Sequence, residues 1–103
     1  MLHVIATVEL NPGTRAAFLA AFKQVVPKVH AEDGCIEYGA TIDATGTGID
    51  RQIPIGPDRV VIVEKWRDLA ALKAHLVAPH MTGYRASVKD YVKATTLQLL
   101  VPA

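Results

Sequence analysis

The spacing of hydrophobic residues changes in a regular order along the chain and predicts alternating strands and helices. Residues Leu2 to Leu10 are rich in β-branched residues and partly alternate apolar with polar positions, which is typical of a strand. Apolar residues then recur at helical spacing from Thr14, which we expect to be the N-cap, to about Ala31. Pro27 is expected to kink the last turns of this helix, and Gly34 to end it.

The rest of the chain predicts three more strands and two short helices. Cys35 to Ile42 form the second predicted strand, with one side made by Ile36, Tyr38, Ala40 and Ile42. Residues 43–58 contain three glycines and two prolines without a sustained period, and we interpret them as a long loop. The remaining predicted elements are a strand over Val60–Arg67, a helix capped by Asp68 and ending near Val77, a helix from Pro79 to Lys89, and a strand over Tyr91–Val101.

The order β-α-β-β-α-(α)-β predicts an α+β fold of the ferredoxin-like split β-α-β type, with an antiparallel sheet and helices on one face. The four consecutive apolar residues from Val60 to Val63 indicate that both faces of the third strand are buried. The predicted helices cover only one face, and an open apolar sheet face would exceed what monomers usually tolerate. We therefore expect a homodimer formed through the sheet face.

Length and composition describe one globular domain over residues 1–103. The chain is 50% hydrophobic and 20% charged with a formal net charge of +1, which gives no basic excess for nucleic acid. Its apolar runs are shorter than the roughly 20 residues of a membrane span, and the N-terminus lacks the charged start of a signal peptide. The single cysteine, Cys35, excludes an internal disulfide and fits a reducing compartment. The predicted location is the cytoplasm.

Ionisable and aromatic residues converge between Val60 and Tyr84. Glu64 and Trp66 share one face of the third strand, so that Trp66 could wall an apolar slot and Glu64 could reach into it. His75 and His80 follow on either side of Pro79, and either imidazole could accept a proton near neutral pH. Pairing of Glu64 with one of these histidines is a further hypothesis, and Tyr84 could donate a hydrogen bond to a substrate oxygen.

Structural explanations exist for the same residues and stay open. Trp66 also suits a core anchor, and Glu64 also suits an ion pair with a lysine or arginine of a neighbouring strand. Either histidine could merely cap or pack, and Tyr38 fits the core as well as a pocket. Motifs for metals and nucleotides are absent: His75 and His80 are five apart with a proline between them, and there is no GxGxxG or GxxxxGK[ST]. No cofactor is predicted.

Four segments of the chain carry a resemblance to a known family: VIATVELNPG, VPKVHAEDGCIEY, DRVVIVEKWRDLAALKAHLVAPHM and LQLLVP. Together they resemble the antibiotic biosynthesis monooxygenase family, most closely its small bacterial quinol monooxygenase branch. This resemblance implies a dimeric α+β barrel that oxidises quinols or related electron-rich aromatics with O2, without metal or organic cofactor. The candidate catalytic residues are His75, His80 and Glu64. The candidate substrate-binding residues are Trp66, Tyr84, Tyr38, Met81 and Phe22.

Related branches of the family leave alternatives. The haem-degrading branch typically presents an asparagine on the first strand, where this chain has none, which argues against haem. Another branch isomerises a phosphorylated sugar-like metabolite and needs cations to hold the phosphate, which Arg51, Arg59, Arg67 and Arg85 could supply. A non-catalytic dimer that binds a small ligand is the third alternative, because a fold alone does not establish turnover.

Overall fold

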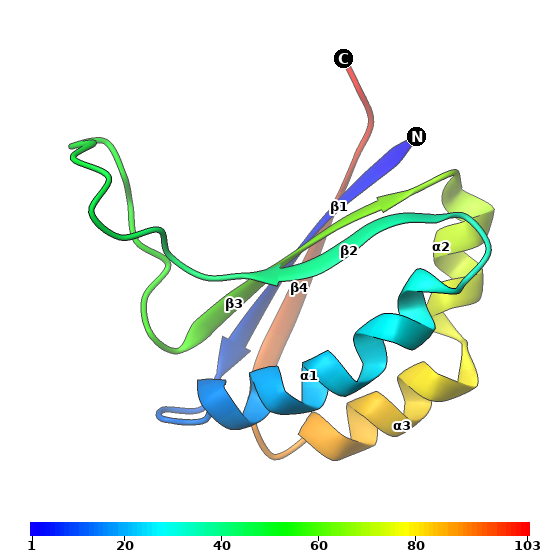
Figure 1. Cartoon of the computed structure of the whole chain (residues 1–103), viewed down its shortest axis with the longest axis horizontal. Coiled ribbons are helices and arrows are strands. Elements are labelled where there is room, and N and C mark those ends of the chain that lie inside the picture. Colours follow the sequence, from blue (N-terminus) through cyan, green and yellow to red (C-terminus); the bar gives the residue numbers. More distant parts are fainter.

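Three helices lie on one face of a four-stranded antiparallel sheet in the computed structural model, which describes residues 1–103 (Figure 1). The strand order in the sheet is β2-β3-β1-β4. This arrangement confirms the predicted ferredoxin-like α+β fold and the predicted order of elements. The elements are β1 Leu2–Leu10, α1 Arg15–His30, β2 Cys35–Thr41, β3 Arg59–Trp66, α2 Leu69–Leu76, α3 Pro79–Val88 and β4 Val92–Leu100.

The two central strands supply the floor of the core. Every second residue of β1 and of β3 is buried against the helices, and the paired residues Val4↔Glu64 and Ala6↔Ile62 face the same side. Trp66, at the end of β3, is completely buried. The predicted shared face of β3 is therefore confirmed, and it does look toward the helices. The buried alternating residues are Val4, Ala6, Val8, Leu10, Val60, Ile62, Glu64 and Trp66.

The helix starts follow the sequence signals in two cases out of three. Asp68 caps α2 by accepting a hydrogen bond from the backbone N–H of Ala71 at 2.9 Å, and Pro79 opens α3. Thr14 occupies the cap position of α1, but its side chain makes no capping bond. Its hydroxyl donates to the carbonyl of Asn11 at 2.7 Å, so the side chain is oriented toward the preceding turn.

The prediction for β2 is confirmed at its first residue, Cys35, but it is wrong in the side given to Ile36 and in its last residue. A register shift between Cys35 and Glu37 displaces Ile36 from the alternation, and this residue is 53% exposed instead of lying beside Tyr38. Ile42 lies beyond the end of the strand and is half exposed. Tyr38 and Ala40 remain on the helix side, because they pair with Glu64 and Ile62.

Residues 42–58 form the predicted long loop, which projects from the sheet as an arm (Figure 1). Its base is fixed by the Asp43 carboxylate, which accepts hydrogen bonds from the backbone N–H groups of Ile55 at 2.8 Å and Gly56 at 3.0 Å. Farther along the arm, Ile49 and Ile53 are 64% and 87% exposed. No helix in the fold has the length and hydrophobicity to cross a bilayer.

Candidate active site

An apolar cavity of about 510 Å³ lies between the helix side of the sheet and α3. Strands β1, β3 and β4 form its floor, and α3 forms its roof. Most of its lining is aliphatic or aromatic, as a binding slot for a flat ring requires. The polar and charged residues among the lining are Tyr38, Glu64, His75, Tyr84, Arg85, Lys89 and Thr95.

His75 is the imidazole that borders this cavity. It is 2% exposed and packs its ring 4.6 Å from that of Trp66 and 5.4 Å from that of Tyr38. Its Nδ1 lies 2.9 Å from a carboxylate oxygen of Glu32. Its Nε2 makes no hydrogen bond within the chain. Every fully buried side-chain nitrogen does make one, so Nε2 is accessible, and it opens onto the cavity that His75 lines. With Glu32 ionised, Nδ1 carries the ring proton and Nε2 is free to accept another.

Glu32 is the residue beside the candidate site that the sequence did not indicate. It lies in the turn between α1 and β2, and the close approach of this turn to α2 carries it to the histidines. Gly34 allows this approach: a Cβ there would come within 2.6 Å of the Ala71 Cβ, and its φ of +86° favours glycine. The Gly34 carbonyl also accepts a hydrogen bond from the Arg67 backbone N–H at 2.8 Å.

The hypothesis that Glu64 pairs with a histidine is wrong. Its Oε1 accepts a hydrogen bond from the indole N–H of Trp66 at 2.9 Å, since residues two apart in a strand project on the same side. Glu64 lines the cavity and is 5% exposed. Burial raises the pKa of its carboxyl, opposed by the Trp66 hydrogen bond. When it is protonated, this carboxyl can donate a hydrogen bond into the cavity.

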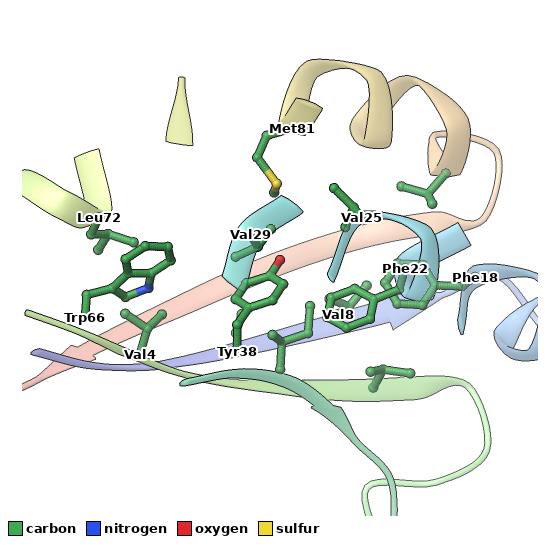
Figure 2. Close-up of a cluster of buried hydrophobic side chains, with 14 of the residues drawn as sticks. Val4, Val8, Phe18, Phe22, Val25, Val29, Tyr38, Trp66, Leu72 and Met81 are labelled. Carbon is green, nitrogen blue, oxygen red and sulfur yellow. The ribbon is translucent and has the colours of Figure 1, made fainter. Parts of the chain in front are cut away.

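The predicted substrate-binding residues divide into two layers. Tyr38, Met81 and Tyr84 line the cavity. Trp66 and Phe22 do not line it; they support the lining, Trp66 from behind His75 and Phe22 through a stacked contact with Tyr38 at 5.3 Å (Figure 2). The hydroxyl groups of Tyr38 and Tyr84 have no partner in the chain, and burial raises the pKa of both phenols, which keeps them as donors.

His80 does not reach the cavity, although it opens α3 as expected. Its Nε2 lies 2.8 Å from the same Glu32 oxygen that binds His75. The structure therefore brings the two histidines together through a carboxylate rather than at one substrate site.

Comparison with known proteins agrees with this arrangement. Residues 1–87 match the family model described as antibiotic biosynthesis monooxygenase. The chain belongs to this family. It is 38% identical over 104 residues to "Probable quinol monooxygenase YgiN" of Escherichia coli (strain K12), across 99% of this chain and 98% of that protein.

Solved structures of similar proteins support the same fold. The structure of Rv0793 from Mycobacterium tuberculosis matches with a TM-score of 0.78 and 28% identity, over 99% of this chain and 94% of that chain. PA3566 from Pseudomonas aeruginosa matches with a TM-score of 0.80 and 24% identity, over 99% and 93%. At the latter identity the match describes the fold alone.

Few of the arginines that could hold a phosphorylated substrate lie at the cavity of this protein. Arg59 and Arg67 pair with surface carboxylates at 3.2 Å and 2.9 Å, and Arg51 lies on the exposed arm. Only Arg85 among the four candidate arginines lines the cavity, where Lys89 joins it. One guanidinium N–H group of Arg85 already donates to the Leu76 carbonyl at 2.8 Å. The cations that line the cavity are thus Arg85 and Lys89.

Proposed function

We propose that this protein is a monooxygenase that oxidises quinols or related electron-rich aromatics with O2 and without a cofactor. The observation that carries the proposal is His75, whose Nε2 has no partner in the chain and opens onto an apolar cavity while Nδ1 lies 2.9 Å from Glu32. The family membership and the name of the Escherichia coli relative support the same reaction class.

The proposed chemistry begins with proton transfer from the quinol hydroxyl to Nε2 of His75. The resulting anion gives up an electron to O2 much more easily than the neutral quinol does. In hydroxylation, one oxygen atom of O2 enters the ring and the other leaves as water, so the quinol becomes a hydroxyquinone. In simple oxidation, O2 leaves as hydrogen peroxide and the quinol becomes the quinone. His75 is assigned as the base in place of His80, because His80 does not border the cavity.

Two phenol donors are placed to hold the developing anion, the hydroxyl groups of Tyr38 and Tyr84, which line the cavity. The carboxyl of Glu64 lines the same cavity and can join them when it is protonated. Donors that are fixed in a water-poor site stabilise charge more than they would in water. Met81 supplies apolar contact from α3, while Trp66 and Phe22 keep His75 and Tyr38 in place.

The decisive test is an oxygen electrode assay of the chelator-treated protein with reduced menadione, against the spontaneous rate. We expect uptake in proportion to protein concentration. Catalase returns half of the oxygen if peroxide forms and none if the ring is hydroxylated, so the same assay separates the two outcomes. Absence of protein-dependent uptake across several quinols would contradict the proposal and favour the isomerase or the non-catalytic binder.

The homodimer is also proposed here. The sheet face opposite the helices is covered by no element of the fold, and at its centre Ile5 pairs with Val63 and Thr7 with Val61. Outward-facing Leu100 of β4 is 49% exposed on the same face. An apolar centre with a polar margin is typical of a surface that a partner covers. A second copy of the sheet is the proposed cover.

Val63→Glu should therefore convert the dimer into a monomer. A carboxylate at the centre of the interface would be buried beside its symmetry mate, and unpaired buried charge is strongly unfavourable. The measurement is the molar mass by sedimentation equilibrium, with Lys73→Glu on the exposed side of α2 as the control. A wild-type protein with the mass of one chain at micromolar concentration would refute the sheet-face dimer.

A further inference from the structure

Three side chains connect the cavity with the outside of the protein. His75 borders the cavity, and its Nδ1 lies 2.9 Å from Oε2 of Glu32. The same oxygen lies 2.8 Å from Nε2 of His80. The exposed fraction of the side chain rises from 3% for His75 to 13% for Glu32 and 20% for His80. The series therefore runs outward, from a buried base to a partly exposed imidazole.

His80 ends this series in a second hollow. A groove of about 680 Å³ lies between α1 and α3, and His80 lines it together with Gln24, Lys28 and Ser87. Tyr84 is the one residue that lines both the groove and the cavity, and His75 lines only the cavity. The two hollows are thus neighbours across α3, and the Glu32–His80 contact joins them.

A base in a filled cavity must release its proton before the next turnover. When a ring occupies the cavity, it covers the open Nε2 of His75, and Nδ1 contacts only Glu32. Burial lowers the pKa of His75, so the imidazolium readily passes its proton on. The nearest acceptor is the carboxylate of Glu32.

We propose that Glu32 and His80 form a proton relay, which exchanges protons between His75 and solvent in the groove between α1 and α3 during turnover. The inference rests on the proposed function, because that reaction supplies the proton. The quinol proton binds Nε2 of His75, and the Nδ1 proton moves to Glu32. His80 then turns its unprotonated ring nitrogen to the carboxyl, accepts that proton and releases its other proton to water. Glu32 returns to the carboxylate, and His75 keeps the quinol proton on Nε2. When reduced oxygen takes that proton to form water or hydrogen peroxide, a proton from solvent returns through His80 and Glu32 to Nδ1, which restores the starting tautomer. No electrons are exchanged in the relay.

Glu32 and His80 are positioning and relay residues in this scheme, since neither borders the cavity. Substitutions of His80 separate the transfer of a proton from the structural role of holding Glu32 in place. His80→Gln keeps an N–H group that can donate to Glu32, but an amide does not carry a proton at neutral pH. His80→Ala removes both functions and leaves space in the groove for a small imidazole. Gln24→Ala is the matched control, because Gln24 lines the same groove and contacts neither Glu32 nor a histidine through a hydrogen bond.

The first measurement is quinol-dependent O2 uptake in weak buffer at fixed pH. We expect both His80 variants to lose about 10- to 10²-fold, less than the loss of the base itself, and Gln24→Ala to be unchanged. Added imidazole should restore His80→Ala in proportion to its concentration. A wild-type rate for His80→Gln would overturn the relay, because holding Glu32 would then suffice. Failure of imidazole to restore His80→Ala would overturn it as well.

A second measurement keeps the test independent of turnover. Exchange of the His75 Nδ1 proton with water can be followed by NMR on ¹⁵N-labelled protein. We expect this exchange to slow by about 10-fold or more in His80→Gln and to recover with imidazole in His80→Ala. Unchanged exchange in both variants would overturn the relay even if the protein oxidises quinols. Slowed exchange without any O2 uptake would retain the relay and reject the proposed function.

Discussion

His75→Ala should reduce quinol-dependent O2 uptake by about 10²- to 10⁴-fold, the usual contribution of a positioned general base. The loss should appear in kcat, since His75 supplies a proton acceptor more than it supplies contact area. Saturation with substrate would therefore not restore the rate. The structural reason is that no other imidazole borders the cavity, and burial keeps the two tyrosines there protonated, as donors.

The pH profile of the wild-type protein checks the same assignment. His75 must be neutral to act as a base, and burial lowers its pKa from the ordinary value of 6.5. The rate should therefore decrease at acidic pH with a midpoint below 6.5, as the imidazole becomes protonated. In His75→Ala this acidic decrease should disappear from whatever rate remains.

Lys73→Ala is the control on the same helix, because Lys73 is exposed to solvent on α2 and lies away from the cavity. It should keep the wild-type rate and the wild-type profile. Circular dichroism and thermal unfolding of His75→Ala would show that the chain still folds. A folded His75→Ala variant with the wild-type rate would mean that the base is a different group.

The fold could be predicted because its signals are local. Alternation in β1 and β3, helical spacing in α1, the Asp68 cap and Pro79 each act within a few residues, and together they give the order of elements. The errors arise where longer-range contacts decide. The shift in β2 that exposes Ile36 depends on how Cys35 and Glu37 pair with β3, which no local pattern of β2 contains.

The site could be predicted only in part for the same reason. His75, Tyr38 and Tyr84 were identified as residue types beside an apolar strand, and the fold places them on one cavity. Glu32 is 43 residues from His75 and 48 from His80 in the sequence. Nothing near Glu32 distinguishes it from an exposed turn residue. Glu64 was the hypothetical partner of a histidine, but in the strand it accepts its hydrogen bond from Trp66, two residues away on the same side.

Trp66→Ala should lower the free energy of unfolding by about 3–5 kcal/mol, the usual cost of removing a large aromatic side chain from a core. Trp66 is completely buried, and its ring supports that of His75 at 4.6 Å. The substitution also removes the hydrogen-bond donor of the buried Glu64. Urea denaturation followed by circular dichroism measures the loss, with an unchanged m-value indicating an unchanged fold.

Trp66→Phe separates the packing of this residue from its hydrogen bond. Phenylalanine keeps most of the buried ring but cannot donate to Glu64, so we expect a loss of only about 1–3 kcal/mol. Because the hydrogen bond favours the ionised form, its loss should raise the pKa of Glu64 further. If Glu64 acts as a neutral donor to the substrate anion, the rate of Trp66→Phe should be maintained despite the weaker fold. A rate that falls as steeply as in His75→Ala would show instead that the indole N–H group itself takes part in the reaction.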